Sequence, residues 1–513
     1  MTCIISTSDL GAHFCNVHHL DPHIELPVEY VDSCSLIRPT RLDLLSKITY
    51  VEEYVSGVLT RQAIFEYKEF IKAFSLGTFI EGDNSKKSFN DFRSSFENLI
   101  DSIKANGFNP LCAVPVGHDN TIIAGAHRTA IMTALKQRIP IVRLDGLFAN
   151  YDANYFRDRG VAEDVIEASL SRLANYINAS VFVLWPSVTR NQREKSLKII
   201  GEEKVIYKRE DYFNYEGLHT LISMTYLGHP WIGCPLNGYA GAVDKTKQII
   251  GKLNNPVTTL LVEMSSNDAL KLKQKIRHSL NCGNSGVHCT DNREESVYLL
   301  RILLNKNTRH LLINGAPFLF RNYIHSIMQY RKKIINNNLN LDNFCIVSSG
   351  VLGLYGLRLP NDIDFLSLSD RYNSILGENT ESHHHVVKQR REIKELINHS
   401  VNYIMFFDIK VISPKYFIRM NKNRPEKTKK MDVGQMNRLL KNEQGELLRY
   451  RCKSKFYKNL RGIKQSRFGI NSILIFMKKH PNFYPVYHWL RQNKIAIGID
   501  KGLSFVINRI PKW

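Results

Sequence analysis

Hydrophobic positions in the first 146 residues follow the repeat of amphipathic helices and then the shorter pattern of strands. Apolar side chains recur on one helical face from Ser56 to Phe74 and again from Asp91 to Ala105. Asn106 and Gly107 then supply a typical helix stop. Residues 108–146 predict, in order, a strand, a hairpin, a strand, a short helix and a final strand. We therefore expect two helices followed by a small α/β unit.

Strand and helix patterns alternate in the middle of the chain. Apolar runs typical of buried strands lie at residues 180–186, 205–208, 258–264 and 286–290. Helical patterns separate these runs, and such alternation favours an α/β layer with some parallel strands. The expected fold class is α/β and α+β with several domains, because a single core seldom grows past about 250 to 300 residues.

The charge of the chain is concentrated at one end. The net charge is +22, and residues 410–513 hold 25 Lys or Arg against 5 Asp or Glu. Aromatic residues interleave with the basic ones after residue 436, which suits an anionic membrane surface, a nucleic acid or a phosphorylated substrate. An alternative is a helical appendage whose Lys and Arg stems cover apolar surface.

Cysteine usage and the absence of long apolar runs bound the location of the protein. Nine cysteines without any C-x-x-C pair indicate neither a disulfide framework nor a zinc ribbon. The first residues lack a basic and apolar leader pattern, and no run approaches about eighteen apolar residues. We expect a cytoplasmic protein, with peripheral contact between its basic end and the inner face of a membrane as one role for that charge.

The strongest chemical signal is a serine turn followed by paired carboxylates. Ser348, Ser349 and Gly350 follow an apolar strand pattern, and a turn of small residues lets backbone N–H groups approach phosphate oxygens. Asp362 and Asp364 are two residues apart, so on a strand both carboxylates project from one face. Two such anions repel each other unless a cation joins them, and hard oxygen ligands suit Mg²⁺ or Mn²⁺.

The order of these residues resembles the DNA polymerase beta-like nucleotidyltransferase superfamily, in which a Gly-Ser turn precedes an Asp-x-Asp strand. Ser348 stands where that family usually has Gly. The resemblance implies a nucleoside triphosphate bound at the turn, and catalytic metal ions held by Asp362, Asp364 and a third carboxylate. Asp408, in an apolar strand pattern, is the best match for that third group. The alternatives are a turn position after Pro360 and Asn361 for Asp362, and solvated strand positions for Asp364 and Asp408.

Basic and histidine residues surround this segment. The resemblance implies that basic residues after Asp408 help to hold the phosphates of the nucleotide. These residues are Lys422, Arg424, Lys427, Lys429 and Lys430. The alternative is a basic surface loop. His383, His384 and His385 are interpreted as part of a solvated loop.

A second turn of the phosphate-binding type lies in the N-terminal part. Gly125 opens a predicted helix, where free N–H groups and the helix dipole favour an anion, and His127 and Arg128 add donors. The turn resembles the ParB/sulfiredoxin superfamily, in which a Gly-x-His-Arg-like turn binds nucleotide phosphate. Ala126 replaces the catalytic Cys of sulfiredoxins, so we expect no thiol-redox chemistry, and Ala124 replaces an acidic residue of many relatives. The alternative is a scaffold in which Arg128 only pairs or caps.

These patterns predict five segments. They are an irregular helical region at 1–88, a ParB/sulfiredoxin-like domain at 89–146, an α/β region at 147–335, a nucleotidyltransferase-like domain at 336–435 and a basic segment at 436–513. The hypothesis that results is a Mg²⁺-dependent nucleotidyltransferase acting on a small-molecule acceptor. The combined resemblance suggests that the acceptor is a precursor of a bacterial surface glycan.

Two other functions remain open from the sequence. One is a small-molecule kinase that uses Gly125, His127 and Arg128. The other is a ParB-related DNA-binding protein. The second is the weaker, because no helix-turn-helix pattern follows Gly146 and the basic charge lies at the far end of the chain.

Overall fold

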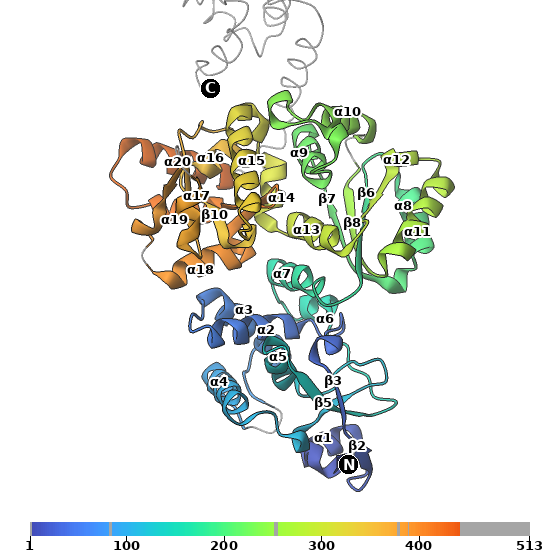
Figure 1. The fold of residues 1–513 in the computed structure, drawn as a ribbon. Helices are drawn as coiled ribbons and strands as arrows, with labels where there is room; N and C mark the ends of the chain where they lie inside the picture. Colours follow the sequence, from blue (N-terminus) through green and yellow to red (C-terminus); the bar gives the residue numbers. More distant parts are fainter. Residues whose placement is uncertain (1–2, 82–84, 251–254, 377–379, 388, 442–513) are drawn as a thin grey trace, which may run out of the picture. The chain divides into compact units, whose positions relative to one another are not determined.

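The computed structural model of the chain describes residues 3–81, 85–250, 255–376, 380–387 and 389–441 (Figure 1). Contacts divide the chain into one compact unit of residues 1–440 and a second unit of residues 441–513. The predicted basic segment therefore falls outside the described residues beyond residue 441. Within the described ranges, none of the helices is both long and apolar enough to cross a membrane.

The N-terminal part contains a three-stranded sheet in the order β3-β5-β4, with β3 antiparallel and β4 parallel to β5. Its elements are β1 (Ile4–Ser6), α1 (Ala12–His18), β2 (Glu25–Pro27), β3 (Glu29–Asp32), α2 (Asp43–Val55), α3 (Arg61–Phe74), α4 (Phe89–Asn106), β4 (Val114–Val116), α5 (Ala126–Ala134) and β5 (Arg138–Arg143). Strands β1 and β2 pair separately. The sheet of the small α/β unit thus includes β3, which precedes the two predicted helices in the sequence.

Side-chain caps set the ends of those helices. The Thr60 hydroxyl accepts a backbone N–H at 3.2 Å and the Ser88 hydroxyl accepts one at 3.3 Å, so α3 and α4 begin directly after them. Helix α4 ends at Gly107, whose φ of 77° is easily adopted only by glycine. The helix predicted from Ser56 therefore begins later, at Arg61.

The middle part contains a four-stranded sheet in the order β7-β8-β6-β9, in which each described pairing is antiparallel. Its strands are β6 (Ala179–Leu184), β7 (Val205–Asp211), β8 (Val257–Glu263) and β9 (Val287–Cys289). The predicted parallel direction is present in this region, but it does not occur between paired strands. Strands β6 and β7 do run in the same direction, as alternation with a helix predicts, but β8 lies between them and pairs with both.

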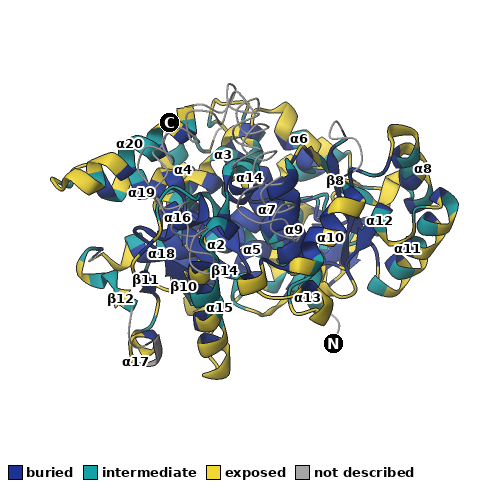
Figure 2. Cartoon of the chain, turned by 90° about the horizontal axis from the view of Figure 1, so that it is seen from above, coloured by how far each residue is buried: buried dark blue, intermediate teal, exposed yellow. Residues whose placement is uncertain are grey.

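The helices of residues 153–336 are α6 (Ala153–Asp158), α7 (Glu163–Leu173), α8 (Arg190–Ile200), α9 (Tyr215–Thr225), α10 (Ala240–Ile249), α11 (Ser266–Leu280), α12 (Gly283–Gly286), α13 (Arg293–Leu303), α14 (Lys306–Asn314) and α15 (Arg321–Asn336). Helices α11 and α13 pack against this sheet, and α14 packs against β13 (Tyr403–Phe406) of the C-terminal part. Helix α9 is buried along its whole length (Figure 2), and so is strand β6. Helix α9 is buried although it carries polar residues, among them Glu216 and His219.

The C-terminal part is a mixed five-stranded sheet in the order β12-β11-β10-β14-β13. Its elements are β10 (Phe344–Ile346), α16 (Gly350–Leu354), β11 (Ile363–Ser367), α17 (Asn373–Leu376), β12 (Thr380–Ser382), α18 (Arg390–Asn398), β13 (Tyr403–Phe406), β14 (Ile409–Ile412), α19 (Pro414–Asn421) and α20 (Lys427–Lys441). Strand β10 pairs antiparallel with β11 and parallel with β14. Strand β12 pairs parallel with β11, and β13 and β14 form a hairpin.

A buried polar network links helices α2 and α3 to the segment after α18. The His399 imidazole lies between two carboxylates, with Nε2 3.0 Å from Glu53 and Nδ1 3.7 Å from Glu66. The Thr60 hydroxyl lies 2.8 Å from the same Nε2, and Arg172 donates to Glu66 at 2.6 Å. Burial alone would lower the pKa of His399, but the hydrogen bond to Glu53 and the charges of Glu53 and Glu66 raise that pKa above the usual range.

Candidate active site

One pocket gathers the serine turn and the paired carboxylates. It has a volume of about 440 Å³ and is formed by the turn after β10, the start of β11, the end of β12 and the start of α20. It is lined by Ser348, Ser349, Arg358, Asn361, Asp362, Asp364, Glu381, His383, His385, Val386, Arg424, Thr428 and Lys429. We refer to it as the acidic pocket. Four residues predicted for this site, Ser348, Ser349, Asp362 and Asp364, line the pocket. Two other predicted residues, Gly350 and Asp408, do not.

The turn after β10 is fixed by its backbone and by close packing beneath it. The Val347 N–H donates to the Asp364 carbonyl at 2.8 Å, which places the turn beside β11. Ser348 has a φ of 53°, in the left-handed region where glycine fits without strain. Gly350 lies under the turn rather than in the pocket, because a Cβ there would lie 2.4 Å from Cγ2 of Ile346.

The two aspartates occupy different electrostatic environments. Asp364 lies in β11 and is 7% exposed, whereas Asp362 directly precedes the strand. Burial and the neighbouring charges of Asp364 and Glu381 raise the pKa of Asp362. Burial also acts to raise the pKa of Asp364, but hydrogen bonds from His383 and Ser348 lower it overall. The pair is therefore held close despite mutual repulsion.

Two further functional residues come from β12 and the turn that follows it. Glu381 is the register partner of Asp364 across the parallel β11–β12 pair. His383 places Nε2 3.1 Å from the Asp364 carboxylate. Ligand atoms of Asp364, Glu381 and His383 all lie within 4.8 Å of one another. The interpretation of the histidine run as a solvated loop is wrong for His383, and for His384 as well, which lies 2.9 Å from the Ser367 carbonyl.

The opposite side of the acidic pocket is basic. Arg424 and Lys429 line it, and the Lys429 Nζ donates to the Ser348 hydroxyl at 3.3 Å. Arg358 also lines it and pairs with Asp432 of α20 at 3.0 Å. Of the five basic residues predicted after Asp408, the structure brings Arg424 and Lys429 to the pocket. Their side chains can bind an anion, and a cation is needed between that anion and the carboxylates of the same pocket.

The residues of the acidic pocket fit a divalent cation. Asp362, Asp364 and Glu381 all line the pocket, and ligand atoms of Asp364 and Glu381 lie within 4.8 Å of one another. Carboxylate oxygens suit Mg²⁺ or Mn²⁺. The imidazole of His383 in the same cluster extends the fit toward Mn²⁺ and the other transition metals that accept nitrogen.

Asp408 does not lie at this pocket. Phe407 and Asp408 form the two-residue turn between β13 and β14, with φ values of 50° and 65°. Strand β14 runs parallel to β10, so the C-terminal end of β14 lies beside the serine turn. Asp408 precedes the N-terminal end of β14 and therefore lies at the opposite end of these strands. The Asp408 carboxylate instead pairs with Arg331 at 2.7 Å. Asp408 therefore does not line the acidic pocket, whereas Glu381 does, beside Asp362 and Asp364.

The N-terminal turn has the predicted backbone, but its side chains make local contacts. Gly125 has a φ of 84° directly before α5. The His127 Nε2 lies 3.0 Å from the Tyr67 hydroxyl. Arg128 donates to the Cys112 carbonyl. Gly125, His127 and Arg128 therefore lie at one turn, and the side chains of His127 and Arg128 form hydrogen bonds within the protein.

A buried cationic cluster lies near the same turn. Arg41 and Lys47 both pair with Asp43, at 3.0 and 2.6 Å. Burial lowers the pKa of His127 well below its usual range, and the charge of Lys47 lowers it further. The His127 ring also packs against Phe96, with ring centroids 4.6 Å apart. His127 is therefore neutral near pH 7 and belongs to an aromatic contact.

Comparison with known proteins identifies no family, no curated protein and no solved structure that matches this chain.

Proposed function

We propose that the acidic pocket is the active site of a metal-dependent nucleotidyltransferase that acts on a small-molecule acceptor. The observation that carries this proposal is the composition of one pocket. Ser348 and Ser349 lie on one side, three carboxylates converge beside them, and Lys429 lies close enough to bond to the Ser348 hydroxyl. This combination supports binding of a triphosphate and a divalent ion in the same place.

Each group in the pocket has a distinct role in this proposal. Asp362, Asp364 and Glu381 would hold Mg²⁺ or Mn²⁺, and the bound ion would supply charge neutralisation for phosphoryl oxygens. Lys429 and Arg424 would bind the phosphates from the basic side of the pocket. The nucleoside triphosphate is then a substrate whose α-phosphorus reacts with an acceptor hydroxyl, and pyrophosphate leaves.

The acceptor class is taken from the resemblance of the two motifs. A surface-glycan precursor is a small hydroxyl-bearing molecule, and the basic charge of residues 410–513 would hold the protein peripherally at an anionic membrane surface on the cytoplasmic side. The proposed acceptor and the basic charge are consistent with each other, because glycan precursors are assembled at membrane surfaces.

Transfer of label from a nucleotide tests the proposal. The full chain is incubated with Mg²⁺ or Mn²⁺, each nucleoside triphosphate labelled at the α or at the γ position, and a bacterial metabolite extract. We expect label to move from the α position in the intact protein and not in D364N. Transfer from the γ position that persists in D364N and disappears in R128Q would establish the kinase alternative. Salt-dependent DNA binding without any transfer would establish the DNA-binding alternative.

A further inference from the structure

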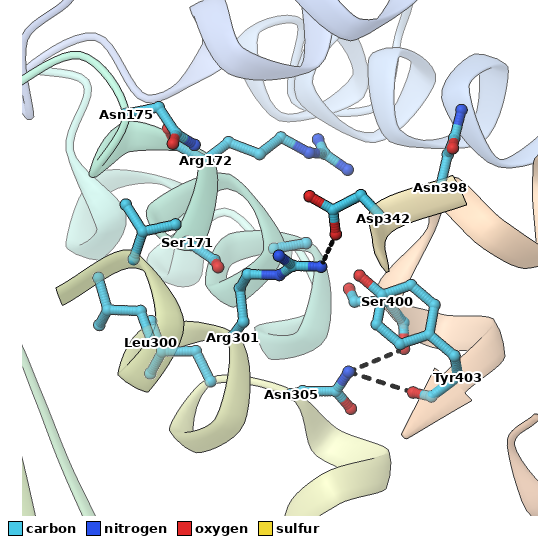
Figure 3. A pocket seen from close by; sticks show the side chains of 13 residues that line it. Ser171, Arg172, Asn175, Leu300, Arg301, Asn305, Asp342, Asn398, Ser400 and Tyr403 are labelled. Carbon is cyan, nitrogen blue, oxygen red and sulfur yellow. Dashed lines mark hydrogen bonds and ion pairs between the residues drawn. The ribbon is translucent and has the colours of Figure 1, made fainter. Parts of the chain in front are cut away.

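A second pocket lies at the other end of β10. It has a volume of about 190 Å³ and is formed by α7, α13, the segment before β10 and the start of β13 (Figure 3). Asp342 precedes β10, whereas Ser348 of the acidic pocket follows it. The two pockets share none of their lining residues. We refer to this second one as the Arg301 pocket.

Positive charge exceeds negative charge at the Arg301 pocket. Arg301 and Lys410 both pair with the single carboxylate of Asp342, and the Lys410 Nζ lies 3.5 Å from it. Arg172 also lines the pocket, and its charge is matched by Glu66. The Arg301 and Asp342 side chains are 26% and 48% exposed, so a ligand can reach both.

Neutral polar side chains form the remaining polar wall. Ser171, Asn398 and Ser400 line the pocket, and Figure 3 shows Ser171 on the side of Arg301 and the other two on the side of Asp342. Hydroxyls and carboxamides both donate and accept hydrogen bonds, which matches the hydroxyl groups of a carbohydrate. Sites for drug-sized ligands start at about 300 Å³, so a ligand of this pocket is smaller than a nucleotide.

We propose that the Arg301 pocket binds a small anionic polyhydroxy metabolite of the sugar phosphate class. The anionic group meets the guanidinium of Arg301, which is 26% exposed, while Asp342 also pairs with Lys410. The hydroxyl groups meet Ser171, Asn398 and Ser400. This inference goes beyond the proposed function, since it concerns a different pocket and requires no metal.

Calorimetric titration of the full chain with glucose 6-phosphate, inorganic phosphate and glucose tests the proposal. EDTA is included so that metal at the acidic pocket does not contribute. We expect glucose 6-phosphate to bind at least tenfold more tightly than either of the other two probes, because both halves of the ligand are recognised.

Four variants separate this pocket from other causes of binding. R301Q removes one of the two cations that pair with Asp342. S171L fills the cavity without changing its charge. Each variant is expected to lower the affinity for glucose 6-phosphate at least tenfold. R190Q is the matched control, because Arg190 pairs with Glu194 in the same way but is 91% exposed. R190Q and D364N are expected to bind as the intact protein does.

Several results would overturn the proposal. These are no binding of glucose 6-phosphate to the intact protein, equal affinity for one of the simpler probes, undiminished binding in S171L, or loss of binding in D364N. If R301Q does not fold, S171L and R190Q still decide the outcome. Because no metal or nucleotide is present, failure here is distinct from failure of nucleotidyl transfer.

Discussion

The two phosphate-type turns differ in what their side chains contact. At the N-terminal turn, His127 bonds to Tyr67 and Arg128 bonds to the Cys112 carbonyl. At the serine turn, Ser348 faces a pocket that also receives charged side chains from β11, β12 and α20. Both turns place a small residue at a helix start, so the local backbone alone does not distinguish them.

This difference shows that the partners of a turn decide its chemistry. The acidic pocket needs Glu381 and Lys429, which lie 33 and 81 residues from Ser348 in the sequence. The N-terminal turn also has distant cations nearby, but Arg41 and Lys47 share the buried Asp43. Charges compensated within the protein are less available to a ligand.

The largest expected effect compares two aspartates of the same sheet. D364N should lower nucleotidyl transfer by about 10³-fold, because it removes a metal-binding charge worth several kcal/mol in the reaction. D408N is the matched control and should change the rate less than about threefold, because Asp408 forms a partly exposed ion pair with Arg331. Initial rates at saturating metal measure both.

The opposite result would reverse the comparison. If D408N lost activity while D364N kept it, Asp408 would be the catalytic carboxylate, as the sequence predicts. The acidic pocket would then not be the active site. Folding of each variant is checked by thermal unfolding before the rates are compared.

The same aspartates show how far the sequence could predict the site. Ser348, Ser349, Asp362 and Asp364 are found because their spacing within one segment carries the pattern. Asp408 is predicted to join the site because the apolar pattern around it indicates one strand, whereas the structure forms a hairpin there and Asp408 does not line the pocket. A two-residue turn with positive φ at both positions normally contains Asn or Gly, and here it contains Phe407, which is fully buried. Tertiary packing overrides the turn preference there.

Other features had weaker signals. Glu381 and His383 join the site through the register of β11 and β12, which no local pattern gives. An acidic residue and a histidine two positions apart in a short polar strand, T-E-S-H, were the available hint. The mixed α/β class and helices such as α3 and α4 were predictable from periodicity, but the insertion of β8 between β6 and β7 depends on long-range pairing.

The second prediction concerns the network that joins α2 and α3 to the C-terminal part. H399A should lower the free energy of unfolding by roughly 3 kcal/mol, because it leaves Glu53 and Glu66 buried with one fewer cation. Urea unfolding measures it. H13A is the control, because His13 is exposed on α1, and it should change stability by less than about 0.5 kcal/mol. Equal losses in the two variants would contradict a role for the network.

The third prediction is the pH dependence of the stability difference between the intact protein and H399A. Since the pKa of His399 is raised from 6.5 on folding, its contribution is fully present below pH 6.5 and is lost as pH rises through the raised value. The pKa values of Glu53 and Glu66 are lowered from 4.5, so their contribution is present above pH 4.5 and is lost as pH falls. The stability gap between the intact protein and H399A should therefore be widest between pH 4.5 and 6.5. A gap that widens steadily toward pH 9 would show that the imidazole is neutral in the fold.

The fourth prediction separates phosphate binding from catalysis in the acidic pocket. K429Q should raise KM for the triphosphate about tenfold with little change in kcat, because one charge-assisted bond is lost in both ground and transition states. K430Q is the control on the same helix, since Lys430 is exposed. A fall in kcat at unchanged KM would instead assign Lys429 to the transition state alone.

The smallest expected effect lies at the N-terminal turn. H127F keeps the ring contact with Phe96 and loses the bond to the Tyr67 hydroxyl, so it should cost about 1 kcal/mol of stability and leave transfer within about twofold of the intact protein. Y67F removes the other end of that bond. If the contact is structural, the two losses are not additive, and the double variant is hardly less stable than either single one. If H127F abolished triphosphate turnover while its stability changed this little, the imidazole would be acting on a ligand, and the N-terminal turn rather than the acidic pocket would be the catalytic one.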